Sequence, residues 1–210
     1  MHPNPAFRAT PAATSLDFAR ARGFGTLCVN AEGGPLLAHV PFLLNADGTE
    51  AEMHLVRSNP IARMATGQTD AVIAVQGPDG YVSPDWYGDA NQVPTWNYVA
   101  VHLRGTLEPA DPATMRAHLD RISAHFEGRL PKTPWTADKM TGDTLERMMR
   151  TILPFRLAVS GIDGTWKLNQ NKTDAMRLAA ADLIAGSGIG QELGTLARLM
   201  RAGSGEMDKP

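Results

Sequence analysis

A basic and polar turn, Arg57-Ser58-Asn59, stands directly before Pro60 in the stretch MHLVRSNPIAR. Asn is a favoured helix N-cap and Pro is favoured at the first helical position, so a helix is predicted to begin there. A guanidinium, a hydroxyl and the free backbone N–H groups of a helix N-terminus together suit a phosphate group. The alternative is that Asn59 only caps the helix and Arg57 is solvated.

The stretch VPTWNYVAVHLRG, residues 93–105, is predicted to enter a strand through a polar and aromatic segment. Period-two alternation places Val99, Val101 and Leu103 toward a core. The outer row then consists of Trp96, Tyr98, Ala100, His102 and Arg104. Such a row suits a planar ligand or a partner subunit. The alternative is a structural aromatic corner with a solvated Arg.

A third polar run, GTWKLNQNKTD, lies directly before a predicted helix. The run contains the amides and ammonium groups of Lys167, Asn169, Gln170, Asn171 and Lys172, which can hydrogen-bond the edge of a heterocycle and neutralise an anion. The alternative is an ordinary exposed loop, because surface loops are rich in these residue types.

The six histidines show no HExxH or HxH spacing, and the chain has a single cysteine, so no metal site is expected. His39 and His54 are expected on adjacent strands of a hairpin, where they either face a ligand or are satisfied edge histidines. The chain has no GxSxG motif and no coherent Ser–His–Asp signature, so the catalytic residues are unknown.

Six or seven short strands, joined mostly by tight turns, predict an antiparallel barrel with peripheral helices. In the strand GGPLLAHVPFLL, alternate residues from Leu36 to Leu44 should share one face. Pro41 lies on the other face and cannot donate a ladder hydrogen bond, so this strand is expected to be an edge or to bulge.

Several element boundaries follow from local signals. Ser15 is expected to cap a short helix, and PDG at 78–80 to turn the chain. A helix over GDTLERMMRTIL should end before Pro154 and precede the strand FRLAVSGI. The barrel is expected to span 1–170, with C-terminal helices over 171–202 packed on it or extending it, and a flexible tail over 203–210.

The composition is that of an ordinary globular protein, with 210 residues, 43% hydrophobic, 20% charged and a net charge of −2. Such a charge gives no electrostatic footprint for DNA or an anionic membrane. Cys28 lies in an apolar run and is expected to be an inert thiol. No apolar stretch is long enough to span a bilayer, and MHPNPAF is not typical of a signal peptide, so the cytoplasm is the expected location.

The chain resembles the PaiB-type FMN-binding negative transcriptional regulators of the split-barrel flavin-binding superfamily. The resembling stretches are MHPNPAF, GPLLAHVPFLL, MHLVRSNP, GYVSPDWYG, VPTWNYVAVHLRG and KLNQNK. The blocks VPTWNY and KLNQNK are the most distinctive. The chain departs from the family at Asn169, where the usual KLSQNK has Ser.

The resemblance implies a six-stranded antiparallel split barrel with a helical C-terminal part, and a homodimer with two FMN sites at the subunit interface. It places Arg57, Ser58 and Asn59 near the FMN phosphate, and His39, Val40 and Pro41 along the isoalloxazine. His54 is a further candidate. The remaining contacts would come partly from the second subunit, through Trp96, Asn97, Lys167, Gln170 and Asn171.

The resemblance also implies a flavin-linked negative transcriptional regulator. The sequence itself offers no basic recognition helix, because Arg177, Arg198 and Arg201 are sparse on the two C-terminal helices. Direct DNA binding therefore stays open. An FMN-dependent oxidoreductase is the alternative, and haem binding through His39 or His54 is a third.

Overall fold

Six strands follow one another in the order β1-β2-β3-β6-β5-β4 in the computed structural model, which describes residues 2–202, and β4 pairs again with β1. The order closes on itself, and the pairs β1–β2, β1–β4, β2–β3 and β3–β6 are antiparallel. The strands are β1 Phe24–Val29, β2 Leu36–Leu44, β3 Glu50–Val56, β4 Thr69–Val82, β5 Thr95–Pro109, β6 Ile152–Lys167 and the short β7 Gly190–Gln191, which pairs with β4. The predicted antiparallel split barrel is confirmed.

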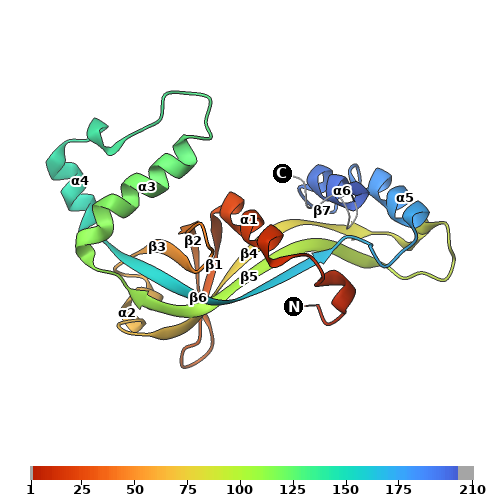
Figure 1. The fold of residues 1–210 in the computed structure, drawn as a ribbon, viewed down its shortest axis with the longest axis horizontal. Coiled ribbons are helices and arrows are strands. Elements are labelled where there is room, and N and C mark those ends of the chain that lie inside the picture. Colours follow the sequence, from red (N-terminus) through yellow and green to blue (C-terminus); the bar gives the residue numbers. More distant parts are fainter. Residues whose placement is uncertain (1, 203–210) are drawn as a thin grey trace. The chain divides into compact units, whose positions relative to one another are not determined.

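Helices are interspersed with these strands along the chain (Figure 1). They are α1 Ala12–Arg22, α2 Pro60–Met64, α3 Met115–Glu127, α4 Gly142–Met149, α5 Asp174–Ile184 and α6 Leu193–Ala202. Short 3₁₀ turns cover Pro5–Phe7, Pro84–Tyr87, Pro112–Thr114 and Ala137–Lys139. Within residues 2–202, no helix is long and apolar enough to cross a bilayer.

The chain divides into two units, and each combines segments that are distant in sequence. Unit 1 comprises the described residues of Met1–Phe18, Val75–His102 and Ile162–Pro210, and unit 2 comprises Ala19–Ala74 and Leu103–Gly161. The ranges 1–170 and 171–202 stay predictions, and the predicted tail at 203–210 lies outside the described residues.

The core of unit 2 is the interior of the barrel. Its largest fully buried side chains on strands are Leu27, Phe42, Met53, Ile73, Leu103, Leu107, Phe155 and Leu157. Every one of the six barrel strands contributes at least one of them. Because side chains alternate across a strand, the intervening residues are left on the outer face, where a ligand can reach them.

Strand β2 confirms the predicted alternation, because Ala38, Val40, Phe42 and Leu44 are buried. Pro41 was predicted to mark an edge strand or a bulge; the edge strand is wrong, and the bulge stays a prediction. Strand β2 pairs with β1 up to Pro41 and with β3 from Phe42 onward, so it has neighbours on both sides. Pro41 is tolerated because it lies where one partner strand gives way to the other.

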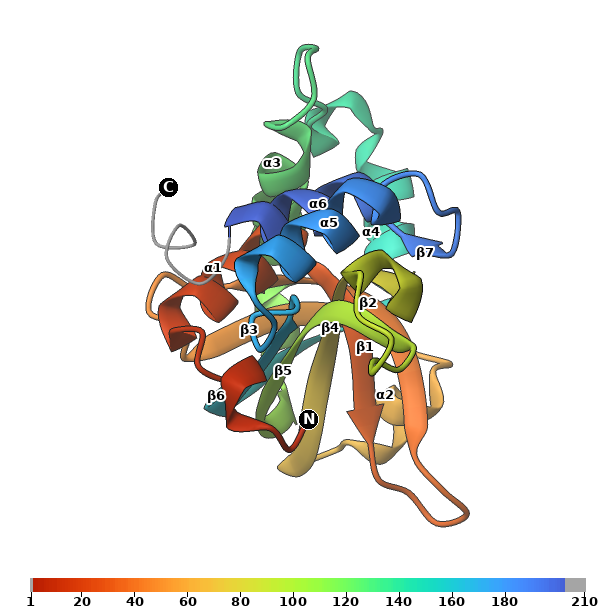
Figure 2. The same ribbon diagram turned by 90° about the vertical axis from the view of Figure 1, so that its right-hand side faces the viewer.

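The ends of β4, β5 and β6 in unit 1 carry α5 and α6, which lie side by side on them (Figure 1 and Figure 2). The predicted turn at 78–80 is wrong, since β4 runs through it to Val82. A Cβ on Gly80 would come within 2.9 Å of side-chain atoms of Leu193 and Ile184. Glycine at this position therefore lets the two helices approach the strand.

Two further boundaries differ from the predictions. Helix α1 begins at Ala12, so Ser15 lies inside it, buried, and accepts a hydrogen bond from Trp166 Nε1 at 3.1 Å instead of capping the helix. Helix α4 ends at Met149, and β6 already begins at Ile152, so Pro154 lies in the strand. Both differences come from partners that are far away in sequence.

Candidate functional site

The predicted flavin segment of β2 lies in unit 2, at the point where the pairing with β3 has not yet begun. Val40 is 2% exposed and points into the barrel, whereas His39 is exposed and Pro41 is half-buried on the outer face. The register of β2 with β3 starts at Phe42↔Met53. Val40 can therefore offer a ligand only its backbone, as the resemblance implies.

The outer face of β1 and β2 is apolar and accessible beside this segment. The His39 ring stacks on Phe24 with centroids 6.5 Å apart, and its Nδ1 lies 3.1 Å from Thr26 Oγ1. Phe24 is 54% exposed and Leu37 is 61% exposed. A flat apolar surface with a few fixed polar groups suits the face of a heteroaromatic ring.

The turn before α2 has the predicted cap. Asn59 Oδ1 accepts a hydrogen bond from Ile61 N at 2.8 Å. Arg57 Nε donates to the Arg150 carbonyl oxygen, at the end of α4, at 2.6 Å. Within residues 2–202, Arg57 has no carboxylate partner, and both Arg57 and Ser58 are exposed. The Arg57 charge is thus held near the turn but not neutralised, which fits an anion.

His54, on β3, lies against α3 in unit 2. Its Nδ1 is 3.0 Å from Nε2 of His118, and the two rings meet edge to face. Burial first, and the neighbouring His118 second, lower the pKa of His54 below its usual range. His54 is therefore a neutral imidazole near pH 7.

Two predicted residues at the start of β5 lie in unit 1 but in contrasting environments. Trp96 is 46% exposed and meets Tyr81 edge to face at 6.3 Å. Asn97 is fully buried, and its Nδ2 donates to Met200 Sδ at 3.4 Å. Its Oδ1 has no hydrogen-bond partner in the described part of the chain. Trp96 is accessible to a ligand in this structure, whereas Asn97 belongs to the core.

The loop after β6 is held together by Gln170. Its Oε1 accepts from Leu168 N at 2.8 Å, and its Nε2 donates to the carbonyl oxygens of Ala6 at 3.0 Å and Trp166 at 2.5 Å. Both amide hydrogens are therefore used inside the protein. Asn171, the next residue, is exposed.

Lys167 and Lys172 form a pair of cations in unit 1. Lys167 Nζ bonds to Thr95 Oγ1 and lies 5.6 Å from the centroid of the Phe7 ring. Lys172 Nζ bonds to Gln92 Oε1. Burial, and then the charge of Lys172, lower the pKa of Lys167. Neither ammonium forms an ion pair with a carboxylate within the described residues, so an anion bound here would relieve their repulsion.

The backbone conformation at position 169 accounts for Asn in place of the Ser of the family motif. Its φ is 65°, in the left-handed region, where Asn is better tolerated than most residues with a side chain. Asn169 is 1% exposed, and its Oδ1 accepts from the Tyr87 hydroxyl at 3.2 Å. Burial raises the pKa of Tyr87, although the bond to Asn169 opposes this. Tyr87 is thus a neutral donor that fixes the loop.

The structure divides the predicted site residues between the units. Those in unit 2 are His39, Val40, Pro41, His54, Arg57, Ser58 and Asn59, and those in unit 1 are Trp96, Asn97, Lys167, Gln170 and Asn171. From the sequence, Lys172 was placed in the polar run but not assigned to the site, Thr95 was not assigned to it either, and His118 was not recognised as the partner of His54. Lys172 lies within KLNQNK, whereas no sequence signal links His118 to His54.

The fold is shared with solved flavoproteins. The FAD and haem binding protein from Mycobacterium smegmatis is similar with a TM-score of 0.54 and 18% identity, over 76% of this chain and 72% of that chain. The flavocytochrome Anf3 from Azotobacter vinelandii is similar with a TM-score of 0.52 and 17% identity, over 73% of this chain and 66% of that chain. Strand order and these likenesses define a split-barrel protein.

A family model described as "Putative FMN-binding domain" matches residues 1–161, and the chain belongs to this family. The protein named Protease synthase and sporulation protein PAI 2, from Bacillus subtilis, is 30% identical over 170 residues, which cover 80% of this chain and 81% of that protein. The resemblance to the PaiB family is thereby confirmed. FMN, the predicted cofactor, is confirmed at the level of the family.

Proposed function

We propose that the protein binds FMN and acts as a flavin-linked negative transcriptional regulator of the PaiB type. The observation that carries this proposal is the match of residues 1–161 to the FMN-binding family, on a barrel whose outer face is accessible at His39. Bound FMN would supply reversible electron transfer, while the chain would bind, orient and tune it. The cytoplasm is the proposed location, in keeping with the free thiol of Cys28.

The phosphate end of FMN is assigned to Arg57, Ser58 and Asn59. Arg57 brings an exposed guanidinium without a carboxylate partner in residues 2–202, and Ser58 brings an exposed hydroxyl. Asn59 keeps the turn in shape through its bond to Ile61 N. The backbone of His39, Val40 and Pro41 is assigned to the isoalloxazine ring.

Replacing Arg57 by Ala tests the phosphate assignment. A hydrogen bond to a charged group contributes about 1.5–3 kcal/mol, so FMN affinity should fall about ten- to a hundredfold. Riboflavin lacks the phosphate, and its affinity should change much less. The control is Arg63→Ala, because Arg63 is equally exposed and lies on α2 near the same turn. Equal losses for FMN and riboflavin in fluorescence titrations would refute the assignment.

We further propose a homodimer whose flavin sites lie at the subunit interface. The partner would contribute Trp96, Lys167 and Asn171 to each site, with Asn97 and Gln170 supporting them from within. The 46% exposure of Trp96 and the unneutralised charge of Lys167 support this role. A ligand that binds only the assembled form stabilises it, so FMN should tighten the dimer.

Sedimentation velocity over a dilution series, with and without FMN, tests the dimer. We expect the midpoint of dissociation to move to lower protein concentration when FMN is added. A protein that stays monomeric at micromolar concentration while binding FMN normally would refute the shared site.

Regulation through the flavin or a protein partner fits better than direct reading of DNA. Arg177 is bonded to the Met200 and Arg201 carbonyl oxygens and to Asp174, and Arg201 is bonded to Asp182. Arg177 and Arg201 therefore join α5 to α6, which leaves Arg198, exposed and bonded to Thr195 Oγ1, as the remaining arginine of the predicted three. A mobility-shift titration at several salt concentrations tests this: salt-sensitive DNA binding would favour direct contact.

A further inference from the structure

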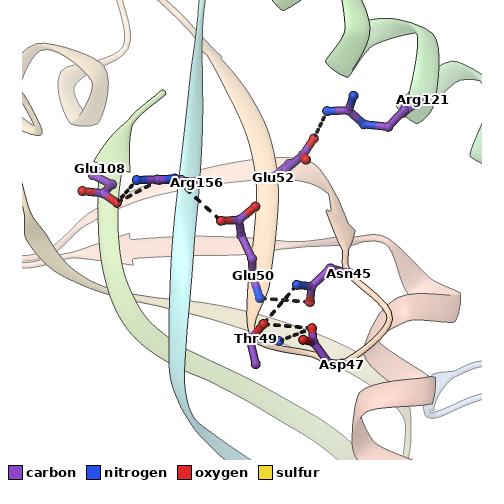
Figure 3. A network of polar contacts seen from close by, with 8 residues as sticks. All are labelled: Asn45, Asp47, Thr49, Glu50, Glu52, Glu108, Arg121 and Arg156. Atoms are coloured by element: carbon purple, nitrogen blue, oxygen red, sulfur yellow. Dashed lines mark hydrogen bonds and ion pairs between the residues drawn. The ribbon is translucent and has the colours of Figure 1, made fainter. Parts of the chain in front are cut away.

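Three side chains form a hydrogen-bonded row within unit 2, namely Glu52 and His54 from the outer face of β3 and His118 from α3. Glu52 Oε2 lies 3.3 Å from His118 Nδ1, and His118 Nε2 lies 3.0 Å from His54 Nδ1. Arg121 NH2 donates to the same Glu52 oxygen at 2.5 Å, a contact drawn in Figure 3. His118 is only 2% exposed, so the middle of this row is shielded from water.

The order of partners determines where the protons lie. A carboxylate can only accept, so His118 Nδ1 must carry the hydrogen that it shares with Glu52. In a neutral His118, Nε2 then has the lone pair, and His54 Nδ1 must donate to it. In a neutral His54, Nε2 is consequently the unprotonated nitrogen. Glu52 thus sets the tautomer of His54 through His118.

The charges around the row act on its protonation in known directions. Burial is the largest influence and lowers the pKa of His118, the bond and charge of Glu52 oppose this, and Arg121 lowers it further. For Glu52 itself, burial acts to raise the pKa, but Arg121 and His118 outweigh it and the pKa is lowered. Arg156 lies opposite Glu52 on β6, and Pro154 lies opposite His54.

The row extends from an open cavity toward the proposed flavin segment. Glu52, His118 and Arg121 line a cavity of about 350 Å³, whose other charged lining residues are Glu50, Asp111 and Arg156. At the other end, the β2–β3 pairing ends at Phe42↔Met53, and the next residues along the two strands, Pro41 and His54, both belong to the outer face. One end of the row, at Glu52, thus lines this cavity, and the other end, at His54, follows the last residue of β3 that pairs with β2.

We propose that His54 is an acid–base group next to the bound flavin, with Glu52 and His118 as its positioning residues. In this step an N–H or O–H bond of the bound molecule would break with its electron pair left on the donor atom, and the proton would form an Nε2–H bond on His54. The positive charge gained by the imidazole equals that lost by the donor, and Glu52 stabilises it through His118. The flavin end of this inference rests on the proposed function, whereas the row itself does not.

The first test needs no variant and no flavin. Two-dimensional ¹H–¹⁵N spectra of the imidazole rings, recorded on FMN-free protein above the titration range, identify which nitrogen carries the hydrogen. We expect the Nδ1–H tautomer for both His54 and His118. An Nε2–H tautomer for His54 would overturn the inference.

The second test removes the charge that positions the row. In Glu52→Gln the side-chain shape is kept but the carboxylate is lost, so the pH at which the His54–His118 pair takes up its first proton should fall by about one unit. Glu50→Gln is the matched control, because Glu50 lies on the same strand but its carboxylate forms an ion pair with Arg156, with Oε2 and NH1 4.0 Å apart. Equal shifts in the two variants, or no shift in Glu52→Gln, would refute the positioning role. Should Glu52→Gln fail to fold, the tautomer of His54 in the natural protein, measured in the first test, decides whether the row positions His54.

The third test adds FMN to the natural protein. The His54 signals should move on titration, whereas those of His125, which lies on the same helix as His118 but bonds to Arg129, should stay in place. If FMN binds and His54 does not respond, the flavin end of the inference is wrong and the proposed function stands. If FMN does not bind, the proposed function is wrong, and so is the proposal that His54 acts on a bound flavin. The tautomer of His54 still shows whether Glu52 and His118 position it.

Discussion

Replacing Gln170 by Ala tests which of two roles this residue has. The resemblance implies that Gln170 contacts the flavin, whereas in the structure its side chain holds the loop after β6 in place by hydrogen bonds. In the folded protein the Gln170 side chain makes three hydrogen bonds, with Leu168 N, the Ala6 carbonyl and the Trp166 carbonyl. The substitution removes all of them at once. The structural role predicts a loss of stability in the absence of any flavin.

The size of the loss follows from the exposure of these bonds. A typical intramolecular hydrogen bond contributes about 0.5–1.5 kcal/mol net. The bond to Ala6 is exposed and water can replace it, whereas the bonds to Leu168 and Trp166 are partly buried. We therefore expect a decrease of about 2 kcal/mol in the free energy of unfolding. For a chain of this size that corresponds to roughly 4–8 °C in Tm.

The assay is urea denaturation of the FMN-free protein, followed by tryptophan fluorescence and by circular dichroism. The matched control is Asn171→Ala, because Asn171 is the next residue and its side chain is exposed. An exposed side chain that packs on nothing should change the free energy of unfolding by less than about 0.5 kcal/mol.

Equal stabilities of the two variants would refute the reasoning. A Gln170→Ala protein that keeps its stability but no longer binds FMN would instead support a direct contact between Gln170 and the flavin. A loss of stability, with FMN affinity preserved in the folded fraction, would support only the structural role of Gln170 in the loop.

Two other predictions concern a close backbone approach and pH. A Cβ on Gly105 would lie 1.9 Å from the Ala158 carbonyl oxygen, whereas within 4 Å a Cβ on Gly161 would meet only Arg104 Cβ, at 3.9 Å. Gly105→Ala should therefore lower the free energy of unfolding by about 3 kcal/mol or more, and Gly161→Ala should not, as measured by urea denaturation. Burial lowers the pKa of His118, so the unfolded chain binds more protons below about pH 6.5 and stability should fall from pH 7.5 to 5.5. His118→Gln should flatten this slope, and an unchanged slope would contradict the assignment.

The parts of the fold that local patterns control could be predicted from the sequence. Alternation along β2 and β5 is a property of each strand by itself, so the buried faces at Val40 and Val99 were predicted correctly. The cap at Asn59 likewise depends only on the two residues that follow it.

The parts that failed depend on distant partners. The PDG stretch has the composition of a turn, but Gly80 is there because Leu193 and Ile184 need its space. Pro41 was taken to mark an edge, although β2 has a second neighbour that starts one residue later. No local signal carries such information.

The site was predictable in its residue types more than in its contacts. The exposed groups Arg57, Ser58 and Trp96 lie where a ligand can reach them. Asn97 and Gln170 have the same polarity in the sequence, yet their side chains are used inside the protein. Burial decides between the two cases, and burial is set by packing that one sequence does not reveal.

The discontinuous make-up of unit 1 has a consequence for synthesis on the ribosome. Unit 2 is complete once residue 161 has emerged, whereas unit 1 needs both its first segment, up to Phe18, and the segment from Ile162 onward. At about 5–20 residues per second, roughly 7–30 s pass between the two. In the folded protein Phe7 is 3% exposed and lies near Lys167 at the end of β6, and the Ala6 carbonyl oxygen accepts a hydrogen bond from Gln170. During that time Lys167 and Gln170 have not yet been synthesised, so both contacts are missing. Until the residues from Ile162 onward have been synthesised, the segment up to Phe18 therefore stays accessible to chaperones and proteases, whereas all residues of unit 2 are already present.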